Sequence, residues 1–101
     1  MLARDESDAL VAGLLCRRHW NYRFVSAVFV DESHGGQGIG AELLAKAEKL
    51  ALREQCIAMY LDSFDFQAPG FYQKLGFEVF GILKDYPPGH QRYFMVKNLS
   101  V

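Results

Sequence analysis

Blocks of apolar residues, separated by polar and turn-forming residues, predict a series of strands along the chain. The apolar blocks are residues 9–17, 24–30, 56–61, 78–83 and 92–96, and a short apolar segment, 1–4, precedes them. The block 24–30 is β-branched and aromatic and carries no charge, so we expect a central strand buried on both faces. Blocks 9–17 and 78–83 are each followed closely by another strand, which predicts two antiparallel hairpins.

Two further segments have the spacing of helices. In residues 38–54 leucine and alanine recur at helical spacing and form one apolar face, which consists of Leu43, Leu44, Ala47, Leu50 and Ala51. Residues 67–75 predict a second helix, because Pro69 suits a first turn and Gly76 suits the C-terminal end. The strands before and after the long helix should be parallel neighbours. The order β, β, β, α, β, α, β, β predicts an α/β protein of the α+β type, with helices packed on a mixed sheet.

Composition limits what kind of protein this is. The chain has 101 residues, which predicts a single domain over 1–101. Its formal net charge is −1 and its basic residues are not clustered, so we expect no nucleic-acid partner. No apolar run approaches the roughly 20 residues of a membrane span, so we expect no membrane partner. Two cysteines in apolar runs and three widely spaced histidines predict a cytoplasmic protein without a metal.

The strand at 24–30 leads into a glycine-rich loop, HGGQGIG, and then into the long helix. Its glycines are Gly35, Gly36, Gly38 and Gly40. Without a Cβ they let backbone N–H groups approach a ligand, and the helix N-terminus aims further N–H groups at the same place. The loop therefore predicts a site for a phosphate or pyrophosphate. The alternative is a tight turn without a ligand, although such a turn usually needs only one residue with positive φ.

Three features together resemble the GCN5-related N-acetyltransferase (GNAT) superfamily over essentially the whole chain. They are the loop HGGQGIG after an apolar strand, the segment FYQKLGF after a second strand, and a terminal hairpin. The resemblance implies an acetyl-CoA-dependent N-acetyltransferase, in which the primary amine of a small molecule or of a protein N-terminus attacks the thioester directly. It also implies a gap between strands 24–30 and 56–61 that admits the pantetheine arm.

The resemblance also assigns residues to the cofactor. Backbone amides of the loop would hold the CoA pyrophosphate, and the end of the preceding strand would pair with pantetheine. The implied cofactor residues are Val28, Val30, Gly35, Gly36, Gln37, Gly38, Ile39, Gly40, Ala41, Asp65 and Tyr72. Two of these depart from the family pattern: Gly35 replaces the usual Arg or Gln, and Asp65 stands where an Asn is usual.

The catalytic assignment that the resemblance implies is Tyr72, as the general acid toward the leaving thiolate. A phenol with a pKa near 10 can donate a proton to a thiolate at neutral pH. Residue type alone favours an aromatic that packs beside Phe71 and Phe77, whereas the position of Tyr72 in the motif favours the catalytic role. The family often places a Glu base on the central strand, but residues 24–30 contain no acid. Candidates for the base by residue type are Glu32, His34, Asp62 and His90.

The start of the chain is the largest departure from the family. The family fold opens with a strand and two helices that cover the acceptor side, whereas this chain begins at what resembles the second strand. We therefore expect the fold to lack the first strand and the first two helices. The apolar surface left uncovered predicts a homodimer, with Trp20, Tyr22 and Phe24 as anchors.

Three other interpretations compete with an acetyltransferase: a dinucleotide-binding fold, a P-loop and a non-catalytic module. Gly36, Gly38 and Ala41 formally satisfy a dinucleotide-binding fingerprint, with Asp62 after the next strand, but a doubly wound fold would continue with further βα units. A P-loop is excluded because no Gly-Lys-Ser/Thr ends the loop. A non-catalytic CoA-binding or dimerisation module derived from a GNAT domain stays open, given Gly35 and the missing acid on the central strand.

Overall fold

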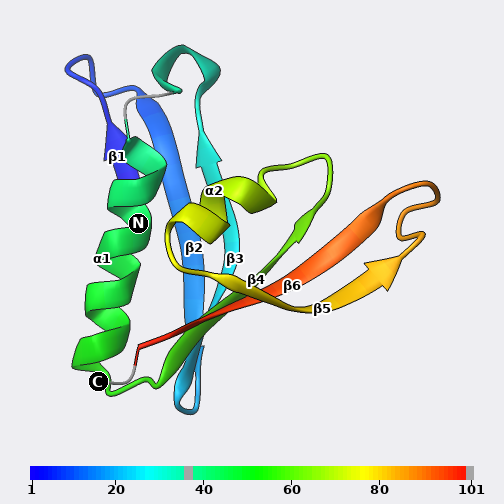
Figure 1. The fold of residues 1–101 in the computed structure, drawn as a ribbon. Coiled ribbons are helices and arrows are strands. Elements are labelled where there is room, and N and C mark those ends of the chain that lie inside the picture. Colours follow the sequence, from blue (N-terminus) through cyan, green and yellow to red (C-terminus); the bar gives the residue numbers. More distant parts are fainter. Residues whose placement is uncertain (36–37, 100–101) are drawn as a thin grey trace.

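The protein forms one mixed sheet with helices against it (Figure 1). The computed structural model describes residues 1–35 and 38–99. The elements are β1 (Leu2–Arg4), β2 (Leu10–His19), β3 (Tyr22–Val30), the 3-10 helix η1 (Glu32–His34), α1 (Ile39–Arg53), β4 (Ala58–Phe64), α2 (Pro69–Lys74), β5 (Glu78–Lys84) and β6 (Gln91–Asn98). In the sheet the strands follow the order β1-β2-β3-β4-β6-β5. The predicted element order and mixed α+β fold are confirmed.

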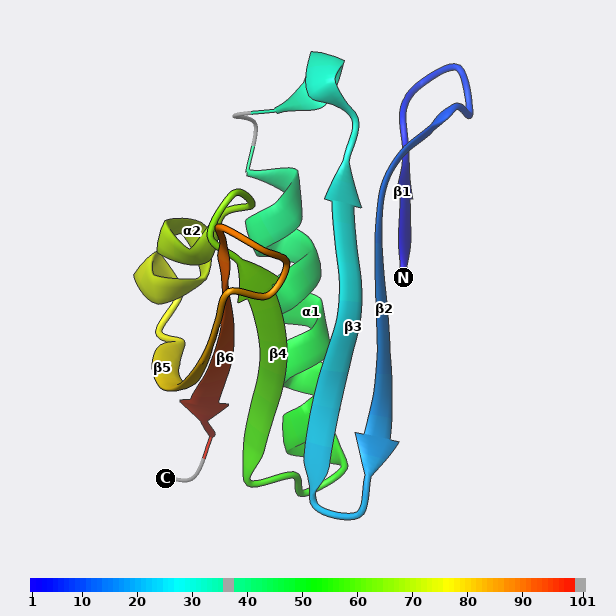
Figure 2. The ribbon, with the colours of Figure 1, turned by 90° about the vertical axis from the view of Figure 1, so that its right-hand side faces the viewer.

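The strands β3 and β4 are parallel, whereas the other neighbouring strands of the described sheet are antiparallel. The long helix α1 connects the two parallel strands, as predicted. Their pairing is short, because the register covers Tyr22–Phe24 on β3 and Ala58–Tyr60 on β4. Past Phe24 and Tyr60 the two strands diverge (Figure 2). The gap predicted between these strands is confirmed.

Several element boundaries differ from those predicted. The strand β2 continues to His19, so the turn before β3 is Trp20–Asn21 rather than 18–23, and polar Arg18 and Arg23 pair across the two strands. A polar side chain does not prevent ladder pairing, because the ladder uses backbone groups. The strand β4 covers Ala58–Phe64 rather than the predicted 56–61. The helix α2 covers Pro69–Lys74 rather than the predicted 67–75.

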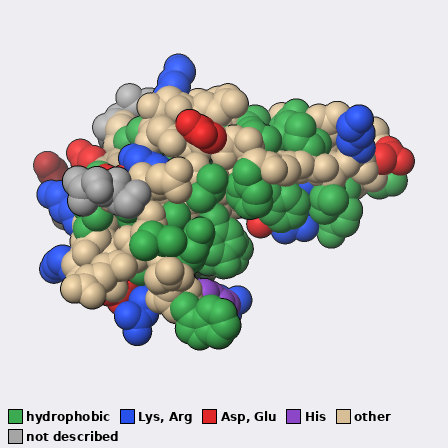
Figure 3. Space-filling model, turned by 60° about the horizontal axis from the view of Figure 1, so that its bottom comes forward, with side chains coloured by type: hydrophobic (Ala, Val, Ile, Leu, Met, Phe, Trp, Pro, Cys, Tyr) green, Lys and Arg blue, Asp and Glu red, His purple; other side chains and the backbone are tan. Residues whose placement is uncertain are grey.

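The prediction that 24–30 is buried on both faces was wrong. Val25 is 4% exposed, whereas Phe29 is 47% exposed, and the two face opposite sides because the β2–β3 register skips Ser26 at a bulge. The helix α1 packs against β2, β3 and β4 on one face of the sheet, so alternate side chains of β3 point to the other face. Figure 3 shows hydrophobic side chains gathered in the centre of the view and along the β5–β6 hairpin at the right.

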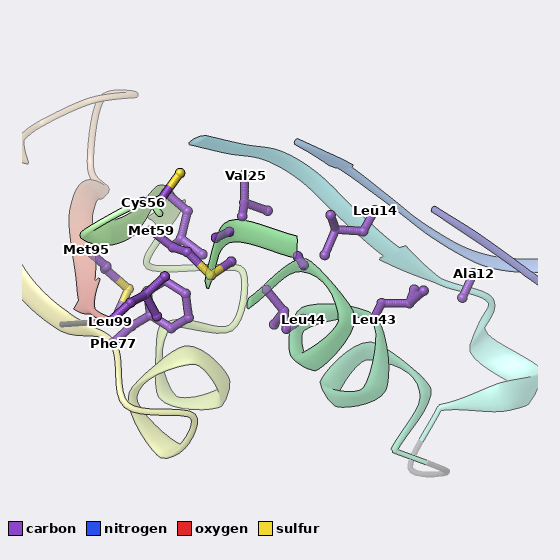
Figure 4. Close-up of a cluster of buried hydrophobic side chains, with 13 residues drawn as sticks. Ala12, Leu14, Val25, Leu43, Leu44, Cys56, Met59, Phe77, Met95 and Leu99 are labelled. Atoms are coloured by element: carbon purple, nitrogen blue, oxygen red, sulfur yellow. The ribbon is translucent and has the colours of Figure 1, made fainter. Parts of the chain in front are cut away.

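The apolar face of α1 supplies much of the core (Figure 4). Four of its five predicted apolar residues are buried, and Leu50 is half-buried. The buried cluster consists of Ala12, Leu14, Val25, Leu43, Leu44, Ala47, Ala51, Cys56, Met59, Leu61, Phe77, Met95 and Leu99. Burial of this cluster fixes α1 against the strands, and with it the position of the helix N-terminus.

An ion pair fastens the paired end of β3 to the end of α1. Arg23 is buried, with 6% of its surface exposed, and its Nε donates to Glu54 Oε1 at 3.0 Å. A second guanidinium nitrogen contacts Cys16 Sγ at 3.3 Å. Removing one partner of such a buried pair leaves an uncompensated charge, which is strongly destabilising. This ion pair therefore holds together the end of the sheet where β3 and β4 are paired.

No helix in the described parts of the chain is long and apolar enough to cross a membrane.

Candidate active site

Two cavities lie side by side along β3. The first, which we call the glycine cavity, has a volume of about 390 Å³ and lies between the end of β3, the start of α1 and α2. The second, the strand cleft, has a volume of about 410 Å³ and lies where β3 and β4 diverge. The two share Val28, Ala68 and Tyr72 as lining residues. Together they form one groove that runs from the glycine loop to the gap between the strands.

The remaining lining residues come from the elements around each cavity. The glycine cavity is further lined by Val30, His34, Gly35, Gly38, Ile39, Gly40, Ala41 and Phe71. The strand cleft is further lined by Val25, Ser26, Ala27, Leu61, Asp62, Phe64 and Gln67. Most of the cofactor residues implied by the sequence thus lie on one groove. The assigned positions Gly36 and Gln37 lie outside the described residues.

The backbone at the start of α1 has the conformation expected of an anion site. Gly38 is the N-cap residue, and its φ of 77° lies in the left-handed region that favours glycine. The first helical bond shown here runs from Glu42 N to Gly38 O at 3.0 Å. The N–H groups of residues 39–41 precede this bond and have no acceptor within the helix. They are therefore available to a ligand beside the positive end of the helix dipole.

Gly40 allows α1 to approach β3 and α2 closely. A Cβ on this residue would lie 3.2 Å from Phe71 Cζ and 3.5 Å from Val30 Cγ2. Gly40 is also buried and lines the glycine cavity. Because Gly40 has no side chain, the first turn of α1 can lie against the groove. This close approach explains the glycine at this position more specifically than a tight loop turn would.

His34 lines the glycine cavity, although the sequence favours an exposed loop position for it. The 3-10 helix η1 folds back after β3, and this leaves His34 half-buried. Its Nδ1 lies 3.0 Å from Ser33 Oγ and 3.3 Å from Asp31 Oδ2. These contacts fix the imidazole ring at the end of the groove where a phosphate would lie. Glu32 is exposed and lines neither cavity.

Tyr72 lies at the junction of the two cavities, on α2. The ring packs edge-on against Phe71 and Phe77, with centroid distances of 5.2 and 6.0 Å. The pKa of Tyr72 is raised mainly by burial and secondarily by the negative charge of Asp62. Both effects keep the phenol protonated at neutral pH. Packing of the Tyr72 ring against Phe71 and Phe77 is therefore compatible with a place on the groove, and its role as general acid stays a prediction.

Asp62 is the one of the four candidate bases that lines the strand cleft. Its carboxylate forms two contacts with Arg92 of β6: Nε donates to Oδ1 at 3.2 Å, and a terminal nitrogen lies 3.0 Å from Oδ2. The Arg92 guanidinium in turn lies over the rings of Phe64, Tyr86 and Phe94, at 5.5, 5.4 and 5.1 Å from their centroids. The sequence could not show this cluster, because its members come from two strands and a hairpin loop.

Asp65 lies away from both cavity linings. Its Oδ1 is 3.0 Å from His90 Nδ1, and its Oδ2 accepts the Gln91 backbone N–H at 3.0 Å. Both carboxylate oxygens thus fasten the β5–β6 hairpin to the loop after β4. The structure does not bring Asp65 or His90 together with the other assigned residues, and contact of Asp65 with a cofactor stays a prediction.

Within residues 1–35 and 38–99, no group of histidine, cysteine and acidic side chains is placed to hold a metal ion.

The sequence and the fold are similar to those of proteins of known family. Residues 1–77 match the model of a family described as "Acetyltransferase (GNAT) family". A blasticidin-S acetyltransferase of Streptomyces morookaense is 39% identical over 98 residues, which are 96% of this chain and 72% of that protein. An acetyltransferase structure from Bacillus cereus ATCC 14579 has a TM-score of 0.94 and 33% identity, over 98% of this chain and 71% of its own.

A more distant structure shares the fold. A Bacillus anthracis protein described as a streptothricin acetyltransferase, solved in complex with acetyl coenzyme A, has a TM-score of 0.86 at 20% identity. The match covers 98% of this chain and 61% of that structure. The sheet and helices described above are therefore those of a fold that has been seen with acetyl-CoA bound.

Proposed function

The chain belongs to the acetyltransferase (GNAT) family, and from this premise we propose that it transfers the acetyl group of acetyl-CoA to the primary amine of a small molecule. The observation that carries the proposal is the continuous groove. One end offers free backbone N–H groups beside Gly38, and the other end opens between two diverging strands. A long, flexible cofactor with a pyrophosphate at one end and a thioester at the other fits such a groove.

The pyrophosphate would lie at the start of α1. We assign it to the backbone amides of the loop that ends in Gly38 and of residues 39–41, with Gly35 and His34 beside it. Because Gly35 carries no side chain, recognition falls on the backbone and on the imidazole of His34. Assignment of Gly36 and Gln37 to the same site stays a prediction from the sequence.

The pantetheine arm would follow β3 toward Tyr72. Among the described residues, the pairing of β3 with β4 ends at Phe24, so backbone groups from Val25 to Val30 face the groove without a β4 partner. Pantetheine carries two amide groups that can pair with such an edge in the way an added strand does. Val28 and Val30 are the residues of this edge that line the glycine cavity.

The chemistry requires one proton to reach the leaving sulfur. The amine nitrogen attacks the thioester carbonyl carbon, a C–N bond forms, the C–S bond breaks, and the CoA thiolate takes the proton of the Tyr72 phenol. The nitrogen releases a proton to water, and the phenolate regains one from water. Tyr72 suits this role because burial and Asp62 raise its pKa and keep it protonated before the transfer.

A small-molecule acceptor is favoured over a protein N-terminus by the relative named for blasticidin S. The test is incubation of the full chain with acetyl-CoA and blasticidin S, with product formation followed by mass spectrometry and binding followed by calorimetry. We expect a product that carries one added acetyl group. Acetyl-CoA binding without transfer to this or any other amine would favour the non-catalytic module instead.

We also propose that the chain forms a homodimer in the cytoplasm. Trp20 is 95% exposed and Tyr22 is 36% exposed at the turn between β2 and β3, whereas Phe24 is half-buried against Tyr60. Of the predicted anchors, Trp20 and Tyr22 are therefore the accessible ones. Sedimentation equilibrium at micromolar concentration should show the mass of two chains. A stable, soluble monomer under those conditions would contradict the dimer.

A further inference from the structure

We infer that Asp62 holds the positively charged amine of the acceptor in the strand cleft, and that Arg92 positions Asp62 for this role. The inference rests on the proposed function and deepens it, because it names the group that recognises the acceptor. It also restricts the acceptor to molecules that arrive as ammonium ions.

The first support is where Asp62 lies. It lines the strand cleft together with Tyr72, and its charge is felt at the Tyr72 phenol. If Tyr72 protonates the leaving sulfur, the acceptor nitrogen must arrive within the same cleft. A carboxylate there can accept hydrogen bonds from an ammonium group next to the thioester. The bound ammonium ion then gives one proton to water, and the neutral amine that results attacks the thioester. The Asp62 side chain retains 22% of its surface exposed, so it is accessible from the cleft.

The second support is how Asp62 is held. Arg92 Nε donates to Asp62 Oδ1 and a terminal guanidinium nitrogen lies 3.0 Å from Oδ2, a two-point contact that fixes the orientation of the carboxylate. A carboxylate offers about four lone-pair positions, so this contact leaves others free for an incoming donor. The rings of Phe64, Tyr86 and Phe94 surround the guanidinium and hold it in turn. The carboxylate is therefore placed before the acceptor arrives.

The third support comes from the other candidates. Glu32 and His90 line neither cavity, and His34 lies at the glycine end of the groove. Asp62 is thus the acid among them that a cation in the strand cleft can reach. The competing explanation is an ion pair that only joins β4 to β6. That role predicts a loss of stability when Asp62 is changed and no change in which ligands the cleft prefers.

The experiment compares two probes of the same shape that differ in charge. Benzylamine and benzyl alcohol are titrated separately into the full chain, and binding is followed by NMR chemical shifts. We expect the wild type to bind benzylamine at least about ten-fold more tightly than benzyl alcohol, because hydrogen bonds to a charged group are the stronger ones. Asp62→Asn should remove this preference. Asp62→Glu, which keeps the charge, should retain part of it.

The control is Glu48→Gln, which breaks the ion pair of Glu48 with Lys97 outside the groove. It should keep the full preference for benzylamine. An unchanged preference in folded Asp62→Asn would overturn the inference, and so would the absence of a preference in the wild type. If Asp62→Asn does not fold, a reduced preference in folded Asp62→Glu supports the inference, because the longer side chain displaces the carboxylate, and an undiminished preference there overturns it. Calorimetry with acetyl-CoA on the same samples tests the proposed function separately, because the amine probes require no cofactor.

Discussion

The two ends of the β3–β4 pair differ in how the two strands contact each other. At one end Tyr22–Phe24 pairs with Ala58–Tyr60, and the buried Arg23–Glu54 ion pair ties β3 to α1. At the other end the same strands diverge, and the space between them is lined by Asp62 and Tyr72. The first end satisfies its backbone groups within the protein, whereas the second leaves an edge free for a ligand.

This difference shows how one pair of strands can serve both stability and binding. Pairing at one end fixes the direction of both strands, and from there the strands diverge toward the gap. The glycine-rich start of α1 closes the groove on the side where β3 ends. Substitutions at the diverging end should therefore change binding or turnover, and substitutions at the paired end should change stability.

The largest effect is expected at the glycine loop. Gly38→Asp places a Cβ at a φ of 77° and a negative charge where the pyrophosphate would lie. Because like charges brought together cost several kcal/mol, we expect acetyl-CoA affinity to fall by about 10³-fold. Calorimetry measures this directly. Gly89→Asp is the matched control, since Gly89 has a φ of 84° and open space around it but lies in the β5–β6 loop. Equal affinity losses in the two variants would show that backbone strain, rather than a phosphate site, is responsible.

The next effect is expected at Tyr72. Tyr72→Phe should lower kcat by about 10²-fold and leave acetyl-CoA affinity nearly unchanged, as loss of a general acid does. Because burial raises the pKa of Tyr72 above its ordinary value, the loss of activity caused by ionisation of Tyr72 should occur at higher pH than for a free phenol. Tyr60→Phe, at the paired end, serves as the control and should keep the wild-type kcat. A wild-type kcat in Tyr72→Phe would show that Tyr72 packs against its neighbours and takes no part in catalysis.

The smallest effect on the groove is expected from the paired end. Arg23→Met removes one partner of the buried ion pair and should cost about 3 kcal/mol of unfolding free energy. Urea unfolding measures this loss. Acetyl-CoA affinity of the folded variant should equal that of the wild type. A folded variant that has lost affinity would mean that the two ends are not independent.

Local patterns in the sequence were sufficient to predict α1, the glycine loop and the parallel β3–β4 pair, whereas the gap between these strands was predicted from the family resemblance. These features depend on neighbouring residues: leucine and alanine at helical spacing, glycines in a short loop, and a parallel pair joined by a helix. Burial of β3 on both faces was predicted wrongly, because an apolar block does not show which of its faces a helix covers. Phe29, exposed on the face away from α1, illustrates this.

The sequence named His34, Asp62 and Asp65 as candidates but could not place their side chains, because these positions depend on distant contacts. His34 enters the groove because η1 folds back, and nothing in the loop's composition indicates that turn. Asp62 is separated by 30 positions from Arg92, the residue that orients it. Asp65 occupies a motif position, yet its carboxylate is engaged by the β5–β6 hairpin. A motif gives a residue's position in the sequence, whereas these contacts depend on how η1 and the β5–β6 hairpin fold back onto the rest of the chain.

The central claim is that acetyl-CoA lies in the groove with its thioester at Tyr72. A crystal structure of the full chain with coenzyme A tests it most directly. We expect the pyrophosphate within hydrogen-bond distance of the N–H groups of residues 38–41, the pantetheine arm along Val28 and Val30, and the sulfur beside the Tyr72 hydroxyl. A pyrophosphate bound away from the start of α1, or a sulfur outside the strand cleft, would contradict the account.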